Sequence, residues 1–402
     1  MIRIVDQVKC IGCGTCQKIC SLDVFRIDVK QPEIPPCMDA CPAENNIREI
    51  NYLLAMGKVA KAAEVMLECN PLASITGRVC ARYCETGCMR NNVDEALSFS
   101  AIEQFLGDYL LQQPVEPVPI QHIDPIAVIG SGPAGLSCAW FLAIQGFSVT
   151  IFEADDEPGG VLRSGIPDSQ LPSFVLSAVI DKVRELGVDI QCNRKLANDF
   201  TLESLIETGF GSVFLGLGCG KLKKVSKKKL DTILGFLPAE LLSEKGLISV
   251  NDETFQTPNP RIFSAGDATT GPASVAEAIG GGKRAAQAIA WYLMGRDLEV
   301  LPPRKRQVLG ASSEISTLKK ISRYRRVPIN YPEQIENTES YLGFDLVQTL
   351  AEADRCMTCG GKAVIAHLDD CMTCFSCELN CPSNAIFVHP FKEILPRALR
   401  PI

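Results

Sequence analysis

The chain has 402 residues, a net charge of −7 at neutral pH and nineteen cysteines. This length predicts two or three domains with buried cores, and the acidic balance argues against a nucleic-acid-binding protein. No stretch approaches the roughly 18 consecutive apolar residues of a membrane helix, and the N-terminus lacks a signal-peptide core. We therefore expect a cytoplasmic protein that binds neither nucleic acid nor membrane, and in that reducing compartment the C-x-x-C spacings indicate metal.

The first element is a cysteine motif flanked by short predicted strands at residues 3–6 and 24–28. It has the spacing C-x2-C-x2-C-x3-C, formed by Cys10, Cys13, Cys16 and Cys20. The same motif closes the chain, formed by Cys371, Cys374, Cys377 and Cys381. This is the spacing of bacterial ferredoxins, in which three thiolates bind one [4Fe-4S] cubane and the fourth crosses to the neighbouring cubane.

Crossing ligands require the two motifs to lie side by side. We therefore expect both termini, residues 1–30 and 362–402, to build one two-cluster ferredoxin domain. One cluster would be bound by Cys10, Cys13, Cys16 and Cys381, and the other by Cys371, Cys374, Cys377 and Cys20. Two independent structural zinc sites are the alternative, but zinc sites seldom use this close spacing.

Helical periodicity follows the first motif, over residues 47–68 and 98–112, and returns at 343–356. Seven more cysteines lie in or beside these segments: Cys37, Cys41, Cys80, Cys84, Cys88, Cys356 and Cys359. We assign residues 31–120 and 343–361 to a helical iron–sulfur domain. Seven ligands are one short of two cubanes, so a non-cysteine ligand is required. The remaining cysteines are expected to pack in apolar surroundings: Cys69, Cys138, Cys192 and Cys219.

A dinucleotide-binding fingerprint organises residues 121–300. An apolar strand ends at Ile129, G-x-G-x-x-G follows from Gly130, a helix covers 134–143, and a second strand, 148–152, ends in Glu153. Such glycines let the backbone approach a pyrophosphate at the helix N-terminus, and the acid can bind a ribose. A tight βα turn with a surface glutamate is the alternative interpretation.

The rest of this region alternates helices, strands and loops. We expect a loop at 157–172, a helix at 175–186, a strand at 212–218, and a further strand that leads through Asp267 into a helix. The basic run 221–230 is interpreted as a solvated loop, with a dock for an acidic partner such as a ferredoxin as the alternative. Residues 301–342 are expected to form a return linker.

Several ordered motifs, among them EPGGVLRSGIP, SAGDATTGPASVAEAI and EADRCMTC, resemble the small subunit of NADPH-dependent glutamate synthase. They are equally similar to the N-terminal part of dihydropyrimidine dehydrogenase and the large subunit of ferredoxin:NADP transhydrogenase. The resemblance covers about residues 34–300 and 325–360 and implies FAD at the fingerprint. The implied FAD-binding residues are Gly130, Ser131, Gly132, Pro133, Ala134, Gly135, Glu153, Gly160, Leu162, Arg163, Gly218, Gly266, Asp267, Ser274 and Val275.

The resemblance also implies two clusters in the helical domain. One would be bound by Cys41, Cys80, Cys84 and Cys88. The cluster nearest FAD would be bound by Cys37, Cys356, Cys359 and Glu103. A plain helix-surface carboxylate is the alternative interpretation of Glu103. The expected fold class is therefore a multidomain α/β protein with a Rossmann-type FAD domain, a helical iron–sulfur domain and a two-[4Fe-4S] ferredoxin domain built from both termini.

Two departures from the family bear on function. The C-x-x-C pair at Cys356 lies near the C-terminus rather than before Cys37, and residues 220–246 leave no room for the family's nicotinamide-binding domain. We therefore expect an electron-transfer subunit with four clusters and FAD, and no catalytic acid, base or nucleophile. It would connect a catalytic subunit, for example of the tungsten aldehyde oxidoreductase type, with a ferredoxin-like carrier. A self-sufficient ferredoxin:NAD(P)+ oxidoreductase and an inert zinc module are the alternatives.

Overall fold

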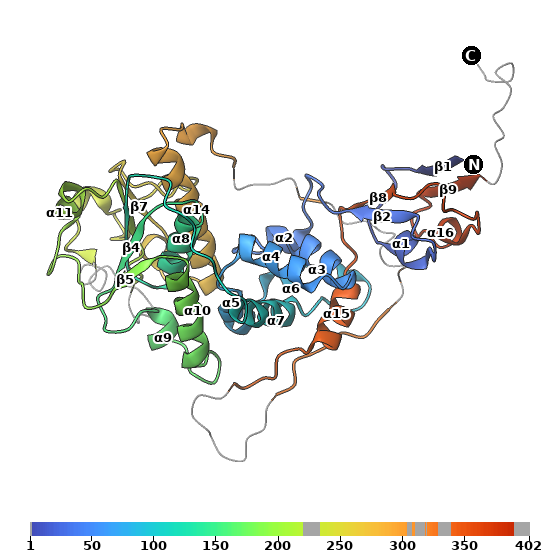
Figure 1. Cartoon of the computed structure of the whole chain (residues 1–402), viewed down its shortest axis with the longest axis horizontal. Coiled ribbons are helices and arrows are strands. Elements are labelled where there is room, and N and C mark those ends of the chain that lie inside the picture. Colours follow the sequence, from blue (N-terminus) through green and yellow to red (C-terminus); the bar gives the residue numbers. More distant parts are fainter. Residues whose placement is uncertain are drawn as a thin grey trace.

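The computed structural model describes residues 2–219, 234–303, 308–309, 318, 320–328 and 339–389. The molecule is elongated, with three parts in a row (Figure 1). A parallel sheet with its helices lies at one end, a group of helices lies in the middle, and two strand pairs lie at the other end. The basic run 221–230 and much of the expected return linker lie outside the described residues.

The sheet has five parallel strands in the order β5-β4-β3-β6-β7. They are β3 (Ile126–Ile129), β4 (Val149–Phe152), β5 (Asp189–Gln191), β6 (Ser212–Leu215) and β7 (Ile262–Ser264). In β3, Ile126 and Val128 belong to one hydrophobic core, whereas Ala127 and Ile129 belong to the core on the opposite face. Burial on both faces explains why this strand is a continuous apolar run.

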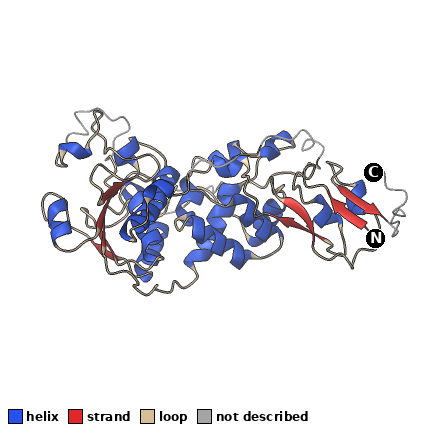
Figure 2. Ribbon diagram, turned by 90° about the horizontal axis from the view of Figure 1, so that it is seen from above, coloured by secondary structure: helices blue, strands red, loops and turns tan. Residues whose placement is uncertain are grey.

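Two helices, α8 (Pro133–Ala143) and α14 (Val275–Leu293), pack against each other on the face of the sheet that is directed toward the middle of the molecule (Figures 1 and 2). Gly282 of α14 permits this packing, because a Cβ there would lie 2.3 Å from the carbonyl oxygen of Ala134 in α8. The other helices of this part are α9 (Val161–Ser164), α10 (Ser173–Glu185), α11 (Leu202–Glu207), η2 (Ala239–Leu241), α13 (Asp267–Thr270) and η3 (Leu298–Val300). Since α9 lies within residues 157–172, the expectation of a plain loop there was wrong.

The middle part is helical and shares one core with α8, α10 and α14. Its elements are α2 (Pro36–Asp39), α3 (Ile47–Ala55), α4 (Val59–Cys69), α5 (Ala73–Val79), α6 (Tyr83–Thr86), η1 (Met89–Asn92), α7 (Phe99–Leu111) and α15 (Leu346–Asp354). The helical stretch expected over 47–68 consists of two helices, α3 and α4, because the chain turns at Gly57, where φ is +70°.

Both ends of the described chain meet in the third part. Strand β1 (Ile2–Val5) pairs antiparallel with β9 (Ile386–His389), and β2 (Phe25–Asp28) pairs antiparallel with β8 (Lys362–Ile365). Two short helices, α1 (Thr15–Ile19) and α16 (Ser376–Leu379), pack against each other beside these pairs over a separate small core. The expected fold class is thereby confirmed.

Among the described residues, no helix combines the length and apolar character needed to cross a membrane.

Candidate functional site

A cavity of about 560 Å³ opens at the carboxyl end of the parallel sheet, and we call it the dinucleotide cavity. Its volume falls within the range of cofactor and small-molecule sites. The fingerprint residues 130–134 form one wall, and residues 265–267 and 273–275 form another. Because β3 and β7 are parallel, the turns that follow them lie at the same edge of the sheet, where doubly wound folds bind their ligands.

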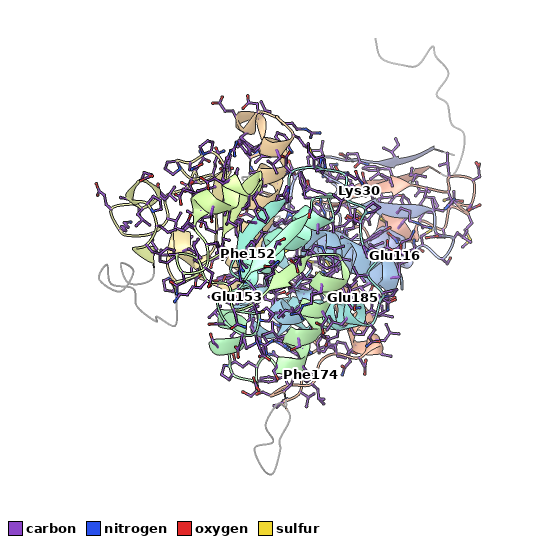
Figure 3. All side chains as sticks on the ribbon, turned by 60° about the vertical axis from the view of Figure 1, so that its left-hand side comes forward. Lys30, Glu116, Phe152, Glu153, Phe174 and Glu185 are labelled. Atoms are coloured by element: carbon purple, nitrogen blue, oxygen red, sulfur yellow. The ribbon has the colours of Figure 1, made fainter. Side chains whose placement is uncertain are left out.

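Glu153 follows β4 and fastens the glycine turn; it lies next to Phe152 in Figure 3. One carboxylate oxygen accepts hydrogen bonds from the backbone N–H of Ser131, at 2.9 Å, and from its hydroxyl. The other accepts from the N–H of Asp155 at 3.0 Å. The Ser131 oxygen in turn accepts from the N–H of Gly159. Glu153 therefore lies at the carboxyl end of β4, as expected, and holds the glycine turn in shape.

The opposite wall carries Asp267 and the start of α14. Ser274 caps this helix in a capping box with Glu277, and both Ser274 and Val275 line the cavity. Burial raises the pKa of the Asp267 carboxyl. Its neighbour Cys219, expected to be a packing residue, also lines the cavity, with its sulfur 3.7 Å from an Asp267 oxygen. Burial, and then the Asp267 charge, raise the pKa of Cys219 to about 11.

Most of the predicted FAD-binding residues line this cavity, and three do not. Gly135, Leu162 and Arg163 are not among the described residues of its wall. Leu162 is buried, and Arg163 instead forms an ion pair with Glu157. The sequence interpretation missed Arg194 and Lys195, which follow β5 and line the cavity mouth. They could have been found, because any segment that follows a strand of this parallel sheet lies at the ligand-binding edge.

The two ferredoxin-like motifs exchange their fourth cysteines in space. One cavity, the N-terminal motif cavity, is lined by Cys10, Cys13, Cys16 and Cys381. A second, the C-terminal motif cavity, is lined by Cys20, Cys371, Cys374 and Cys377. These are the two sets expected from the crossed spacing. Consistent with this, burial raises the pKa of Cys377 to about 11, and the charges of Cys20 and Cys371 add to the rise.

A third cavity, the inner cysteine cavity, lies in the helical part. It is lined by Cys37, Cys84, Cys88, Cys356 and Cys359. Cys88 thus lies with Cys37 and the C-terminal pair and not with Cys80, as the family resemblance implied. This placement differs from the division of ligands that the resemblance implied.

Glu103 lies with the other cysteines of the helical part. Burial raises the pKa of Cys41 to about 12, and the largest further contribution comes from Glu103. The same carboxylate adds to the raised pKa values of Cys80 and Cys84. We call Cys41, Cys80, Cys84 and Glu103 the Glu103 group. The swap of Cys88 and Glu103 has a simple origin, because α2 and α6 pack together. Each helix carries one cysteine, Cys37 or Cys84, and a second cysteine follows four residues later, Cys41 or Cys88.

Glu103 is not a helix-surface residue. It is 4% exposed, and one of its oxygens accepts hydrogen bonds from Asn45 at 2.7 Å, Thr76 at 2.8 Å and Asn70 at 3.0 Å. Burial raises its pKa to about 7 despite these bonds. A buried carboxylate that is held so firmly beside three thiols has the chemistry of a metal ligand.

In the described part of the chain, no three histidine, cysteine, aspartate or glutamate side chains lie close enough to share one metal ion. A cubane does not require such an arrangement, because each of its four iron atoms binds a different side chain.

The groups lie in sequence along the molecule. Helix α14 begins at the dinucleotide cavity, and five residues further its Gly280 touches Pro42, which follows Cys41. A Cβ on Gly280 would lie 1.9 Å from the Pro42 carbonyl oxygen. Cys84, of the Glu103 group, also lines the inner cysteine cavity. On the far side of that cavity, Cys359 is close enough for the charge of Cys13 to contribute to its raised pKa, after burial and nearer cysteines.

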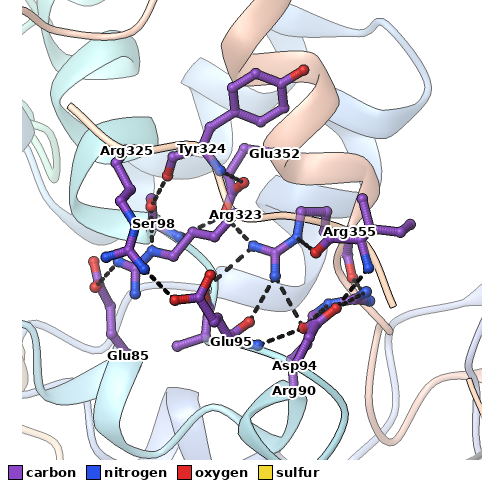
Figure 4. Close-up of polar contacts among 12 residues, drawn as sticks. Glu85, Arg90, Asp94, Glu95, Ser98, Arg323, Tyr324, Arg325, Glu352 and Arg355 are labelled. Atoms are coloured by element: carbon purple, nitrogen blue, oxygen red, sulfur yellow. Dashed lines mark hydrogen bonds and ion pairs between the residues drawn. The ribbon is translucent and has the colours of Figure 1, made fainter. Parts of the chain in front are cut away.

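A buried ionic network holds the helix that delivers Cys356 (Figure 4). Arg355 is 1% exposed and donates to Glu352 at 2.7 Å and to Asp94 at 3.0 Å. Glu352 accepts from the backbone N–H groups of Ser98 and Tyr324. The network thus joins α15 both to the segment before α7 and to residues 320–328.

Two family models match this chain. Residues 27–115 match the model described as dihydropyrimidine dehydrogenase domain II, 4Fe-4S cluster, and residues 128–180 match the model of an NAD(P)-binding Rossmann-like domain. The chain therefore carries a 4Fe-4S cluster domain followed by a Rossmann-type dinucleotide-binding domain.

Three curated relatives extend these matches. The chain is 35% identical over 202 residues to the NADPH-Fe(3+) oxidoreductase subunit beta of Geobacter sulfurreducens, covering 49% of this chain and 30% of that protein. It is 36% identical over 190 residues to the NAD-dependent dihydropyrimidine dehydrogenase subunit PreT of Escherichia coli, covering 46% of each. It is 32% identical over 207 residues to the NADP(+)-dependent formate dehydrogenase subunit beta of Moorella thermoacetica, covering 46% of this chain and 29% of that protein.

The chain thus spans less than half the length of these relatives. Over that length it is homologous to oxidoreductase subunits of the flavin and iron–sulfur type, and the resemblance inferred from the sequence motifs is confirmed.

Proposed function

We propose, on the premise of this homology, that the chain is an electron-transfer subunit of a multi-subunit oxidoreductase. It would relay electrons through FAD and four [4Fe-4S] clusters between a catalytic partner subunit and a ferredoxin-like carrier. FAD exchanges one or two electrons, and each cluster exchanges single electrons. The observation that carries this proposal is the row of four cysteine groups that extends from the dinucleotide cavity to the opposite end of the molecule.

The dinucleotide cavity supports FAD as the bound group. The first turn of α8 presents unpaired N–H groups to a pyrophosphate, and the Glu153 carboxylate lies where a ribose would be bound. The start of α14 supplies a positive dipole end at the opposite wall, where it stabilises negative charge. Asp267 and Ser274 complete that wall.

The cysteine groups support four clusters. Each cavity of the terminal part has four thiols, the inner cysteine cavity takes Cys37, Cys88, Cys356 and Cys359, and the Glu103 group supplies three thiols and a carboxylate. Burial raises the pKa values of most of these thiols, so the ligands are largely protonated without metal, and cluster binding must displace their protons.

The order of the groups supports a route. We propose the sequence dinucleotide cavity, Glu103 group, inner cysteine cavity, N-terminal motif cavity and C-terminal motif cavity. Of the nineteen cysteines, all in the described part of the chain, Cys374 alone is exposed. Because electronic coupling falls steeply with distance, this end of the route is where we expect an external carrier to exchange electrons. We keep the tungsten aldehyde oxidoreductase type as the candidate for the catalytic partner. A cytoplasmic location is part of the same proposal.

A self-sufficient ferredoxin:NAD(P)+ oxidoreductase is the second candidate. It is favoured by the match of residues 128–180 to an NAD(P)-binding model and by the nicotinamide nucleotides in the names of the relatives. The lack of a separate nicotinamide-binding domain stays a prediction, because residues 220–233 lie outside the described residues.

Anaerobic titration of the isolated, reconstituted chain distinguishes the two candidates. The relay predicts bound FAD, about sixteen iron and sixteen sulfide per chain, and bleaching of the flavin by a reduced ferredoxin but not by NADH or NADPH. Rapid bleaching by NADH or NADPH alone would establish the self-sufficient enzyme instead. Zinc in place of iron would exclude both.

A further inference from the structure

Arg48 lies in the wall of the inner cysteine cavity. It is the second residue of α3 and is only 3% exposed. Its terminal nitrogens donate to three main-chain carbonyls, those of Glu33 at 2.9 Å, Gln31 at 2.9 Å and Cys359 at 3.3 Å. These bonds fix the guanidinium plane against the turn that carries Cys359.

The Nε–H of Arg48 has no partner. It is buried and donates to no atom in the described part of the chain. A buried N–H of a charged group that stays unsatisfied destabilises a protein by more than a neutral one does, since the group has lost its hydration. Three other hydrogen bonds hold the Arg48 side chain in place, so its free Nε–H can donate a hydrogen bond to a group bound in the cavity.

Arg48 also forms no direct ion pair with a carboxylate in the described part of the chain. Arg90 lines the same cavity but forms an ion pair with Asp94 at 2.8 Å. Burial lowers the pKa of Arg48, and the largest opposing influences come from Cys37 and Cys359, followed by Asp28. The positive charge of Arg48 is thus directed at the cysteine groups.

We propose that Arg48 tunes the cluster of the inner cysteine cavity, by donating its Nε–H to a sulfur atom there and by raising the midpoint potential of that cluster above the value it would have without the arginine. Hydrogen bonds to the sulfurs and nearby charge are established determinants of cluster potential. The reduced form carries one more negative charge, so a fixed cation and an N–H donor stabilise it more than the oxidised form. This inference rests on the proposed function, which places a cluster in this cavity.

Potentiometric titration of the full, anaerobically reconstituted chain, followed by EPR, tests the proposal. Cys37→Ala identifies which reduction step belongs to the inner cysteine cavity, because that step should disappear while iron falls by about four atoms per chain. Arg48→Met removes both the charge and the Nε–H. Arg48→Lys keeps a charge but lacks the Nε–H. Lys61→Met makes the same change of net charge at an exposed position of α4 that does not line the cavity.

The expected result is a lower potential for the identified step in Arg48→Met, a smaller decrease in Arg48→Lys, and no shift in Lys61→Met. An unchanged potential in Arg48→Met with full iron content would overturn the tuning role, as would an equal shift in Lys61→Met. Loss of the cluster from both Arg48 variants would also overturn it, since Arg48 would then only build the cavity. If Cys37→Ala removes no reduction step, the proposed function fails first.

Discussion

The terminal cavities and the helical groups each bring four candidate cluster ligands together, but they draw these ligands from the chain in different ways. In each terminal cavity three cysteines come from one short motif, and only the fourth crosses from the other end of the chain. The helical groups instead draw on distant segments: the inner cysteine cavity combines α2, the turn after α6 and the turn after α15. Their ligand sets therefore depend on how helices pack.

The difference explains which sequence expectations were reliable. Three thiolates spaced C-x2-C-x2-C wrap one corner of a cubane for local geometric reasons, so their grouping follows from spacing. Cysteines four residues apart at the packed elements α2 and α6 carry no such information. Cys37 lines the inner cysteine cavity and Cys41 does not, whereas Cys84 and Cys88 both line it and Cys84 also lies beside Glu103.

The largest expected effect comes from breaking the packing that the helical groups need. Arg355→Ala should lower the free energy of unfolding by about 3–5 kcal/mol, because it leaves Glu352, which is fully buried, without its ion-pair partner. It should also remove the cluster bound by Cys356 while both terminal clusters persist. Denaturant unfolding and iron content measure the two effects.

The control is Arg325→Ala, which removes an arginine that is 66% exposed and pairs with Glu95. A surface pair contributes at most about 1 kcal/mol. Similar losses in the two variants would show that the buried network does not hold α15.

The second prediction tests the revised division of the helical ligands. Cys88→Ala and Cys37→Ala should abolish the same EPR signal, because both side chains line the inner cysteine cavity. Glu103→Ala should change a different signal, since the Glu103 carboxylate lies close enough to Cys41 and Cys80 for its charge to raise their pKa values. If Cys88→Ala and Glu103→Ala instead act on one signal, the two groups are divided wrongly.

A third and smaller effect should come from the crossing ligands. Cys381→Ser should disturb the cluster held mainly by the N-terminal motif and leave the C-terminal cluster intact, because Cys381 lines the N-terminal motif cavity. Serine can still supply an oxygen ligand, so we expect a shifted potential more than complete loss. Cys20→Ser is the matched variant and should act on the other cluster. An altered C-terminal signal in Cys381→Ser would refute the crossing.

The smallest effect is expected at the dinucleotide cavity. Its glycine turn is built by one continuous segment, so it serves as the local reference in the comparison with the helical groups. Ser131→Ala removes the hydroxyl that joins Glu153 to Gly159. A lost hydrogen bond of about 1.4 kcal/mol corresponds to roughly tenfold weaker FAD binding. Fluorescence titration of apoprotein measures it, with Thr208→Ala on the remote α11 cap as control. Equal affinity in Ser131→Ala and the parent chain would remove Ser131 from the binding turn.

The sequence by itself determined those features that depend on neighbours along the chain. The strand, glycine turn and helix around Gly130, the position of Glu153, and the two cysteine motifs all follow from local spacing, because steric and hydrogen-bonding constraints act over a few residues. The sequence also predicted that the termini meet, because the fourth cysteine of each motif binds the cluster of the other motif.

Only the tertiary structure decided how elements distant in the chain share their side chains. It placed Cys88 in the same cavity as Cys37 and buried Glu103 beside Cys41. It also brought Arg48 within hydrogen-bonding distance of the Cys359 carbonyl. Periodicity marks which residues of a helix are buried but not what they are buried against. That choice depends on the packing of whole helices, and on buried charges such as Arg355 that are stable only where their partners meet them.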